Sequence, residues 1–325
     1  MRSLKESILS TSKVGKFDEW NQLKKEHAHP KDKAELKETI KKAIELKGPN
    51  VDLNWIDVSA MINMTFMFAE TEFNGDISEW DVSNVKYMYG MFADSKFNGD
   101  ISKWDVSKVE DMSFLFSNSP FNGDISKWDV KNVLAMKYMF WNSKFNGDIS
   151  NWNVSNVRDM DYMFKDNHAF NGDISKWDVS NVRAMSYMFW NADFNGDISK
   201  WNTSNVKTMF ATFEGSKFNG DISKWDVSNV KNMEYMFQHS IFNGDISNWN
   251  MRKVESMKYM FANSQFNRDI SNWDIRSVKD MNNMFENSPF NQDLSKWDVS
   301  NVKKMSNMFK NTPLEKNPPI WYKKK

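Results

Sequence analysis

Ten aspartates stand at equivalent positions of a repeated Phe-Asn-x-Asp segment, 24 residues apart, or 25 where one residue is inserted near His168. Carboxylates about 5 Å apart repel by roughly 0.8 kcal/mol in water and about 3 kcal/mol at an effective dielectric of 20. We therefore expect each to accept backbone N–H groups in its own corner, the alternative being that the column binds cations. One aspartate per repeat supplies too few oxygens for calcium, and equivalent carboxylates leave none with a distinct catalytic pKa. The ten are Asp76, Asp100, Asp124, Asp148, Asp173, Asp197, Asp221, Asp245, Asp269 and Asp293.

A second charged pattern is Lys-Trp-Asp, in which the two charged residues flank an apolar one. Residues two apart share a face of an extended segment, so these charges are expected on the outside, beside their counterparts in neighbouring repeats. Exposed pairs contribute at most about 1 kcal/mol each, and their first role is a soluble surface. A partner bound there should be extended or periodic. The candidates are Lys103 and Asp105, Lys127 and Asp129, Lys176 and Asp178, and Lys224 and Asp226.

The position after the Met-Phe pair varies between copies, which is typical of an exposed column. Trp141 and Trp190 occupy it two repeats apart, and we expect both in solvent, about 10 Å from each other. Exposed tryptophan is enriched at binding hot spots, so these two are the strongest binding candidates. The column reads Ala69, Ala93, Ser117, Trp141, Lys165, Trp190, Glu214, Gln238, Ala262, Glu286 and Lys310.

Eleven other tryptophans recur at the repeat spacing, from Trp55 to Trp297. With lysines beside them they could form a stacking platform for bases or sugars. A tryptophan, however, buries about 150–250 Å², and the repeats contain few other residues large enough to fill a core. The Trp column is therefore predicted to point inward.

The sequence contains no set of residues typical of a catalytic centre. Cysteine is absent, which excludes disulfides, thiolate nucleophiles and Cys-ligated metals. His27 and His29 lack a third metal ligand nearby, and neither a Gly-rich phosphate loop, a G-x-S-x-G motif nor an H-E-x-x-H motif occurs. We expect no enzyme activity, no bound metal and no cofactor.

The 24-residue period itself predicts the architecture. A fixed period of this length indicates a solenoid in which each unit packs on its neighbours. Alternation around Trp80 and Val82 favours a short parallel strand, and the spacing of Met88, Met91 and Phe92 favours a helical turn. We therefore expect an α/β repeat solenoid, coiled right-handedly like leucine-rich repeats, with one strand and one helical turn per repeat.

Three regions are expected along the chain. Residues 1–50 should form an N-terminal helical cap, because an amphipathic stretch ends at Gly48-Pro49 and its apolar stripe can cover the first repeat. Residues 51–310 should form eleven repeats, the first one degenerate. Residues 311–325 contain three prolines and an Ile-Trp-Tyr run, which predicts a C-terminal cap followed by a basic tail.

The repeat FNGDISKWDVSNV followed by Met-Phe resembles the BspA-like leucine-rich repeat family, whose members are bacterial surface proteins and related proteins of mostly unknown function. The resemblance covers about residues 50–310. It implies a curved solenoid that acts in adhesion or protein binding. Ala60, Lys108, Lys253 and Ser277 interrupt the asparagine column of the signature, which argues against a continuous buried asparagine ladder.

Charge and hydropathy limit the classes of partner that the chain is expected to bind. The whole chain has no net charge, but residues 51–310 carry 27 basic and 34 acidic side chains, a poor match for nucleic acid. No apolar stretch reaches membrane-spanning length and no secretory leader is recognisable, so we expect a cytoplasmic monomer, with surface or virion association as the alternative.

Together these patterns predict a non-enzymatic scaffold for protein–protein interaction or adhesion. The alternative is a glycan-binding module, in which aromatic and Asn or Asp side chains line an exposed ridge.

Overall fold

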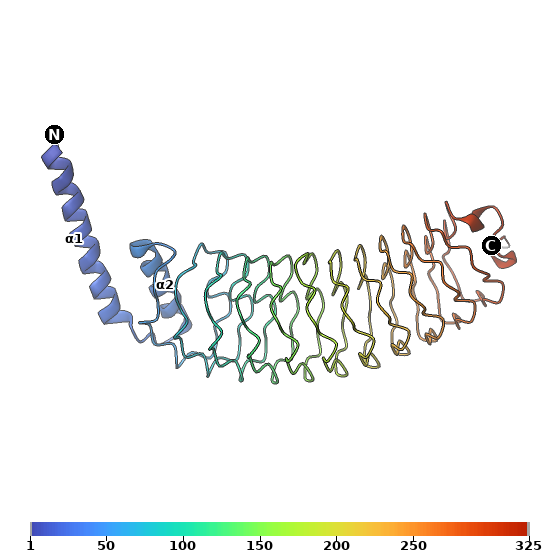
Figure 1. The fold of residues 1–325 in the computed structure, drawn as a ribbon, viewed down its shortest axis with the longest axis horizontal. Helices are drawn as coiled ribbons and strands as arrows, with labels where there is room; N and C mark the ends of the chain where they lie inside the picture. The colour runs from blue at the N-terminus through green and yellow to red at the C-terminus, as the bar shows by residue number, and fades with distance from the viewer. Residues whose placement is uncertain (1, 324–325) are drawn as a thin grey trace.

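The computed structural model describes the backbone of residues 2–323 and the side chains of residues 15–322. The chain forms one long, gently curved row of stacked coils with helices at its ends (Figure 1). The helices are α1 (Arg2–His27), α2 (Lys33–Lys47), the 3-10 helix η1 (Pro313–Glu315) and α3 (Ile320–Lys323). The predicted repeat solenoid with a period of about 24 residues and N-terminal helices is therefore confirmed.

The predicted strand around Trp80 is wrong. Ile77–Trp80 and Val82–Val85 are instead tight turns, in which the amide of the last residue donates to the carbonyl of the first, at 3.2 and 2.9 Å. The carboxylates of Asp76 and Asp81 each accept an amide N–H two residues further on, at 2.9 and 3.0 Å. These local bonds compete with a strand ladder, while still sending Trp80 and Val82 inward.

The predicted helical turn after Met88 is also wrong, because this segment forms the hydrogen-bonded ladder between coils. Met88 and Gly90 donate their amides to the carbonyls of Asp111 and Ser113 in the next coil, at 3.1 and 2.8 Å. Every second amide continues this pattern, and two residues per coil adopt a positive φ, as Gly90 and Asp94 do. Within the described residues, β-pairing consists of one isolated parallel bridge between successive coils, from Asn63↔Tyr87 to Asp280↔Lys304. The coils are therefore built from turns, and the α/β class does not apply to them.

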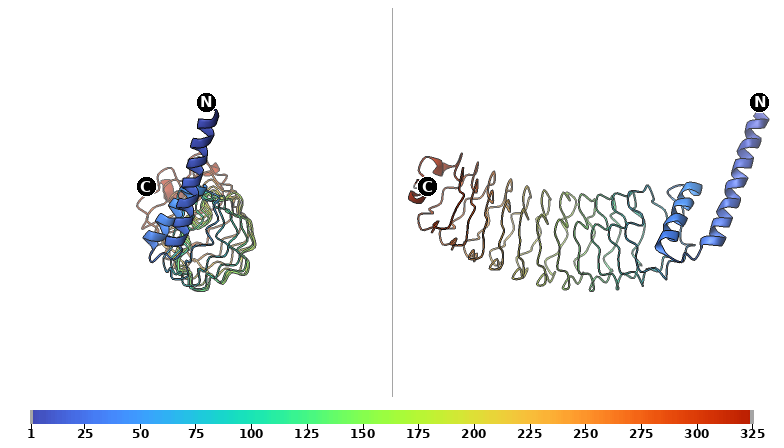
Figure 2. Two further views of the ribbon diagram at one scale, coloured as in Figure 1. Left: turned by 90° about the vertical axis from the view of Figure 1, so that its left-hand side faces the viewer. Right: turned by 180° about the vertical axis from the view of Figure 1, so that it is seen from behind.

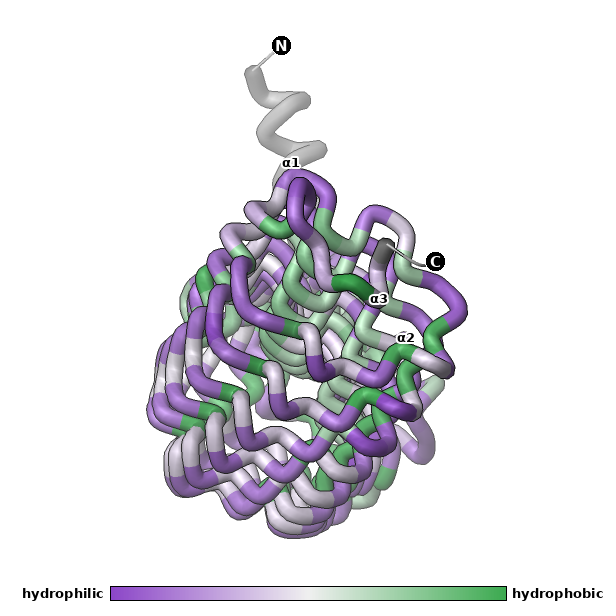
Figure 3. The backbone as a smooth tube through the Cα atoms, turned by 90° about the vertical axis from the view of Figure 1, so that its right-hand side faces the viewer, coloured by the Kyte–Doolittle hydropathy of each residue, from purple (hydrophilic) through white to green (hydrophobic). Residues whose placement is uncertain are grey.

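Three columns of stacked aromatic rings fill the interior. The ring centroid of Phe92 lies 4.3 Å from that of Phe97 in the neighbouring column, and 5.8 Å from that of Phe116, the next member of its own column. Viewed along the row, hydrophobic and hydrophilic residues alternate around each coil (Figure 3). Ten of the eleven column tryptophans, Trp80 to Trp297, are only 3–4% exposed, so the prediction that the Trp column points inward is confirmed for them, whereas Trp55 of the degenerate first repeat is only partly buried.

Each interior indole is fixed by the preceding coil. The indole Nε1–H of Trp177, for example, donates to the carbonyl of Ile149 at 3.0 Å. The same bond recurs in every coil from Trp80 onward. A column of one residue type thus provides both the apolar filling and a polar link from coil to coil.

The two ends of the row are closed differently (Figure 2). At the N-terminal end, α2 begins after Asp32, whose carboxylate accepts the amide of Glu35, and it buries Leu36, Ile40 and Ala43 in the common core. At the other end, Trp321 of α3 stacks 6.4 Å from Trp297 and donates to the carbonyl of Leu294 at 2.8 Å. Trp321, expected only as part of a C-terminal cap, thus also continues the Trp column.

No helix among residues 2–323 is both long enough and apolar enough to cross a bilayer. Of the regions expected from the sequence, residue 1 and the last two residues of the basic tail lie outside the described backbone.

Candidate functional site

A continuous row of nine aromatic side chains runs along the outside of the coils, and we call it the aromatic row. Neighbouring ring centroids lie 4.1–5.3 Å apart. The rings are half-buried, except that Phe66 is 44% exposed. The members are Phe66, Tyr89, Phe114, Tyr138, Tyr162, Tyr187, Phe210, Tyr235 and Tyr259.

Local backbone geometry explains why these rings point outward. Most occupy the first positive-φ position of the coil, as Tyr162 does with a φ of 62°, between two methionines that point inward. Two coils depart from this register, since Gly90 and Ala211 take the positive-φ position and the aromatic residue stands one place earlier. The sequence signal that was missed is the recurrent Tyr-Met-Phe tripeptide.

The register change at Phe210 opens a groove. Tyr138, Tyr162 and Tyr187 stack nearly parallel, at 4.1 and 4.4 Å. Phe210, in contrast, is tilted by 48° to Tyr187, with centroids 5.1 Å apart. A groove of about 500 Å³ lies at this position, and we call it the aromatic groove. It is lined by Tyr162, Lys165, Tyr187, Trp190, Phe210, Glu214 and Tyr235.

Lys165 lies between the two tryptophans singled out from the sequence. Its ammonium group is 4.1 Å from the ring centroid of Trp190 and 5.3 Å from that of Trp141. Asp166 completes the cluster, because one carboxylate oxygen is 3.4 Å from the Lys165 Nζ and accepts the indole N–H of Trp141 at 3.2 Å. Cation–π contacts of this kind strengthen as the cation is desolvated.

The expectation that Trp141 and Trp190 stand free in solvent is therefore wrong. Both are half-buried, and their column is not uniformly exposed, since Ala93, Ser117 and Ala262 are at most 6% exposed. The rings of Trp141 and Trp190 pack edge-on against Tyr138 and Tyr187 of the aromatic row, with centroids 5.8 and 6.2 Å apart. Of the two, only Trp190 lines the aromatic groove.

The groove also contains groups whose ionisation is opposed by burial. Burial raises the pKa of the Glu214 carboxyl, and a hydrogen bond from Trp190 partly offsets this rise. Burial raises the pKa of Tyr187 to about 12, so its hydroxyl is a neutral hydrogen-bonding group at physiological pH. The aromatic groove thus combines aromatic rings with the Lys165 ammonium group, which lies over Trp190, and with the Glu214 carboxyl, whose pKa is raised.

A family model described as "Mycoplasma protein of unknown function, DUF285" matches the chain four times, over residues 34–144, 117–219, 191–265 and 207–321. The matches extend from α2 to α3 and include every coil. The chain belongs to the DUF285 family. No curated protein matches it significantly, and neither does any solved structure.

In this DUF285 chain the Lys-Trp-Asp lysines predicted as binding candidates, Lys103, Lys127, Lys176 and Lys224, are all exposed. Lys103 pairs with Glu79 of the preceding coil at 3.5 Å. None of the four pairs with the aspartate of its own tripeptide among the described ion pairs. The corresponding aspartates instead accept backbone amides two residues ahead, and they are Asp105, Asp129, Asp178 and Asp226.

The Phe-Asn-x-Asp aspartates behave as predicted. In all ten copies one carboxylate oxygen accepts the amide N–H of the residue two places on, at 2.8–2.9 Å. Hydrogen bonds from that residue lower the pKa of Asp148 and of its counterparts. Within the described part of the DUF285 chain, no group of three or more His, Asp or Glu side chains is arranged to hold a metal ion.

Asp161, next to Tyr162 of the aromatic groove, is an aspartate whose pKa shifts in the opposite direction. Burial, and the like charge of Asp159, raise its pKa to about 6, against the favourable amide bond from Ser186 at 2.6 Å. Because the folded-state pKa lies above the unfolded value near 4, the penalty is absent below pH 4 and grows as the pH rises to 6.

We expect Asp161→Asn to raise the free energy of unfolding by about 1 kcal/mol at pH 7.5 and to leave it unchanged at pH 4, since the amide keeps an acceptor for Ser186. Urea unfolding at the two pH values measures this. Asp148→Asn is the matched control and should give no gain at pH 7.5. An equal gain at both pH values would show that burial of the Asp161 charge is not the cause.

Proposed function

We propose that this chain is a non-enzymatic scaffold that binds an extended protein segment in the aromatic groove. The observation that carries the proposal is the register change of the aromatic row at Phe210, where a hollow of about 500 Å³ is lined by Trp190, three tyrosines, Lys165 and Glu214. Tryptophan and tyrosine in partly desolvated hollows are enriched at protein-binding hot spots. An extended segment fits because the groove follows a row of coils about 4.8 Å apart.

The stacking within the aromatic row favours a protein partner over a glycan. Tyr138, Tyr162 and Tyr187 cover each other's ring faces at 4.1–4.4 Å, so they offer edges and hydroxyl groups outward. Aromatic edges and hydroxyls suit peptide groups and apolar side chains, whereas a sugar that stacks on aromatic residues requires an open face. The likeness of the repeat to BspA-like leucine-rich repeat proteins supports the same role, adhesion or protein binding.

The turn aspartates give no support for an enzyme. Each carboxylate of that column has the same amide contact in its own turn, so none is set apart for proton transfer.

Selection of random 12-residue peptides displayed on phage, against the immobilised full chain, tests the proposal. Enriched peptides should bind the unchanged protein, and Trp190→Ala should weaken their affinity about 30-fold, the effect of losing a hot spot worth about 2 kcal/mol. Phe17→Ala removes an exposed aromatic ring from α1 and is the matched control, which should bind normally. Melting temperatures establish that both variants remain folded.

Two outcomes would contradict the proposed function. One is that no peptide is enriched, or that enriched peptides bind Trp190→Ala and the unchanged chain equally well. The other is a glycan array that returns ligands lost in Trp190→Ala, which would make this groove a sugar site.

A further inference from the structure

A different surface carries a row of basic side chains, which we call the cationic row. In seven consecutive coils, it consists of the residue directly after the Val that ends the second tight turn of the coil. Each backbone amide in it donates to the carbonyl of the preceding member, at 2.8–3.0 Å, so the seven side chains leave the body at adjacent points. Six of the seven are cations. The row reads Arg158, Arg183, Lys207, Lys231, Glu255, Lys279 and Lys303.

Little within the molecule neutralises this row. Among the described residues, Arg158, Arg183 and Lys207 are exposed and make no ion pair. Lys231 and Lys279 share the single carboxylate of Glu255, at 3.8 and 2.6 Å.

Departures from the repeat add further cations at the C-terminal half of the row. The Ser-Asn that precedes Val in most coils is replaced by Arg252-Lys253, and in the next coil by Arg276-Ser277. Both arginines share Asp274, while Lys253 Nζ donates to the Asn229 side chain at 2.6 Å. The guanidinium and ammonium groups are therefore held in place but remain under-neutralised.

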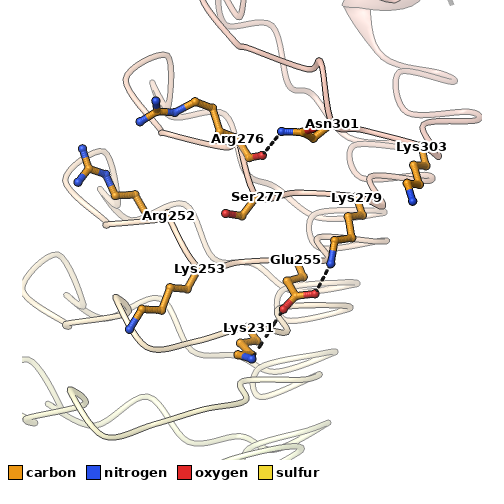
Figure 4. A pocket seen from close by; sticks show the side chains of 9 residues that line it. All are labelled: Lys231, Arg252, Lys253, Glu255, Arg276, Ser277, Lys279, Asn301 and Lys303. Atoms are coloured by element: carbon orange, nitrogen blue, oxygen red, sulfur yellow. Dashed lines mark hydrogen bonds and ion pairs between the residues drawn. The ribbon is translucent and has the colours of Figure 1, made fainter.

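These groups border one open depression of about 510 Å³ (Figure 4). Its lining contains six cations and one carboxylate: Lys231, Arg252, Lys253, Glu255, Arg276, Lys279 and Lys303, together with Ser277 and Asn301.

The same column is not basic in the N-terminal coils. There it reads Ile62, Lys86, Glu110 and Leu134, and Lys86 pairs with Glu110 at 3.6 Å. The positive charge is therefore a local feature of one half of the solenoid, although residues 51–310 as a whole are acidic. A general need for solubility does not produce such a distribution along a single column.

We propose that the cationic row binds a linear polyanion, a sulfated polysaccharide. Six coil spacings of about 4.8 Å place the outer members roughly 29 Å apart, which matches an extended chain that carries an anionic group at each step. Binding gains free energy by releasing counterions from the polymer, and arginine pairs well with tetrahedral oxyanions. This site goes beyond the proposed peptide groove and does not depend on it.

The aromatic row favours a sulfated sugar over single-stranded nucleic acid, which is also a linear polymer with regularly spaced anionic groups. Proteins that bind single strands stack the bases on open aromatic faces. Four residues further along the coils, Tyr162 is covered on both faces, by Tyr138 at 4.1 Å and by Tyr187 at 4.4 Å, so it offers no open face next to Arg158, and Tyr187 next to Arg183 has one face covered. The cationic row therefore recognises its ligand through charge.

Titration of the full chain with a fluorescent heparin dodecasaccharide at several salt concentrations tests the inference. We expect Arg158→Gln/Arg183→Gln/Lys207→Gln to weaken binding at least about tenfold and to reduce the slope of log affinity against log salt by about 2–3. Lys103→Gln/Lys127→Gln/Lys176→Gln removes the same charge from another column and should change affinity less than about twofold, because separate exposed charges are screened.

Three further results decide the outcome. Fully desulfated heparin should not bind; if it binds as tightly as heparin, sulfate is not what the row recognises. Equal losses in the two triple variants would assign binding to diffuse charge and overturn the site. A single-stranded DNA 12-mer that binds more tightly than the heparin fragment would assign the row to nucleic acid.

Discussion

Trp177→Ala is expected to lower the free energy of unfolding by about 3–5 kcal/mol. The indole is 3% exposed and stacks 6.4 Å from Trp201 with an angle of 3° between the rings. Its removal creates a cavity in the middle of the row and leaves the Ile149 carbonyl without its donor. Because each coil packs only on its neighbours, this defect separates two halves that otherwise stabilise each other. Chemical unfolding followed by circular dichroism measures the loss.

Trp177→Phe is the matched variant for this experiment. It keeps an aromatic ring in the column but has no N–H group, so the loss should be clearly smaller, with about 1–2 kcal/mol due to the missing hydrogen bond. A loss below about 1 kcal/mol for Trp177→Ala is inconsistent with a buried ring and would contradict the packing described above.

Ile40→Asp in α2 should have an effect of similar size, about 3–5 kcal/mol, because it buries an unpaired charge. Ile40 is 3% exposed and belongs to the same core as the first coils, whose apolar face α2 covers. Without the cap, the degenerate first repeat and its buried Met67, which lies beside Ile40, become exposed to water. Thermal unfolding and limited proteolysis at the N-terminal end measure this effect.

Lys42→Ala makes the same change in net charge on the exposed side of α2 and serves as control, with an expected effect below about 0.5 kcal/mol. If Ile40→Asp were tolerated as well as Lys42→Ala, α2 would not be the cap of the solenoid.

Column positions in the sequence were sufficient to predict the core. Large apolar side chains that recur every 24 residues can all be buried only if they stack in columns inside the coils. Trp80, Phe73 and Phe92 are buried in this way. The turn aspartates were predictable for a similar reason, because a column of like charges requires local donors. Trp321 was predicted only as part of the C-terminal cap, although it stands 24 residues after Trp297 and stacks on it as the next member of the Trp column.

The backbone conformation could not be derived in the same way. An alternating in–out pattern arises from a strand, but also from two turns separated by one extended residue, as at Trp80, Asp81 and Val82. Likewise, the spacing of Met88 and Met91 suits a helical turn, whereas the amides of Met88 and Gly90 bond to the next coil and only that of Met91 bonds back to Met88. The positive φ of residues such as Tyr162 depends on this stacking and has no local signal, since tyrosine does not favour that region.

Of the candidate site, Trp190 was predicted from the sequence, but the aromatic groove that it lines was not. The aromatic groove depends on a one-residue shift of an aromatic side chain, from position 211 to Phe210, whose effect on the ring stack requires the structure. The cationic row was not predicted, because the net charge of residues 51–310 is negative and gives no sign of a local cluster of basic residues. Only the coil-to-coil hydrogen bonds show that Arg158, Arg183 and Lys207 are adjacent.

Hydrogen exchange of the tryptophan indoles, followed by NMR on protein labelled with nitrogen-15, tests the stacked-coil architecture most directly. The ten interior indole N–H groups, from Trp80 to Trp297, each donate to a carbonyl of the preceding coil and should exchange slowly as one cooperative set. Trp20, a partly buried ring outside the column, should exchange fast. Rapid exchange of the interior set under native conditions would contradict coils linked through their indoles.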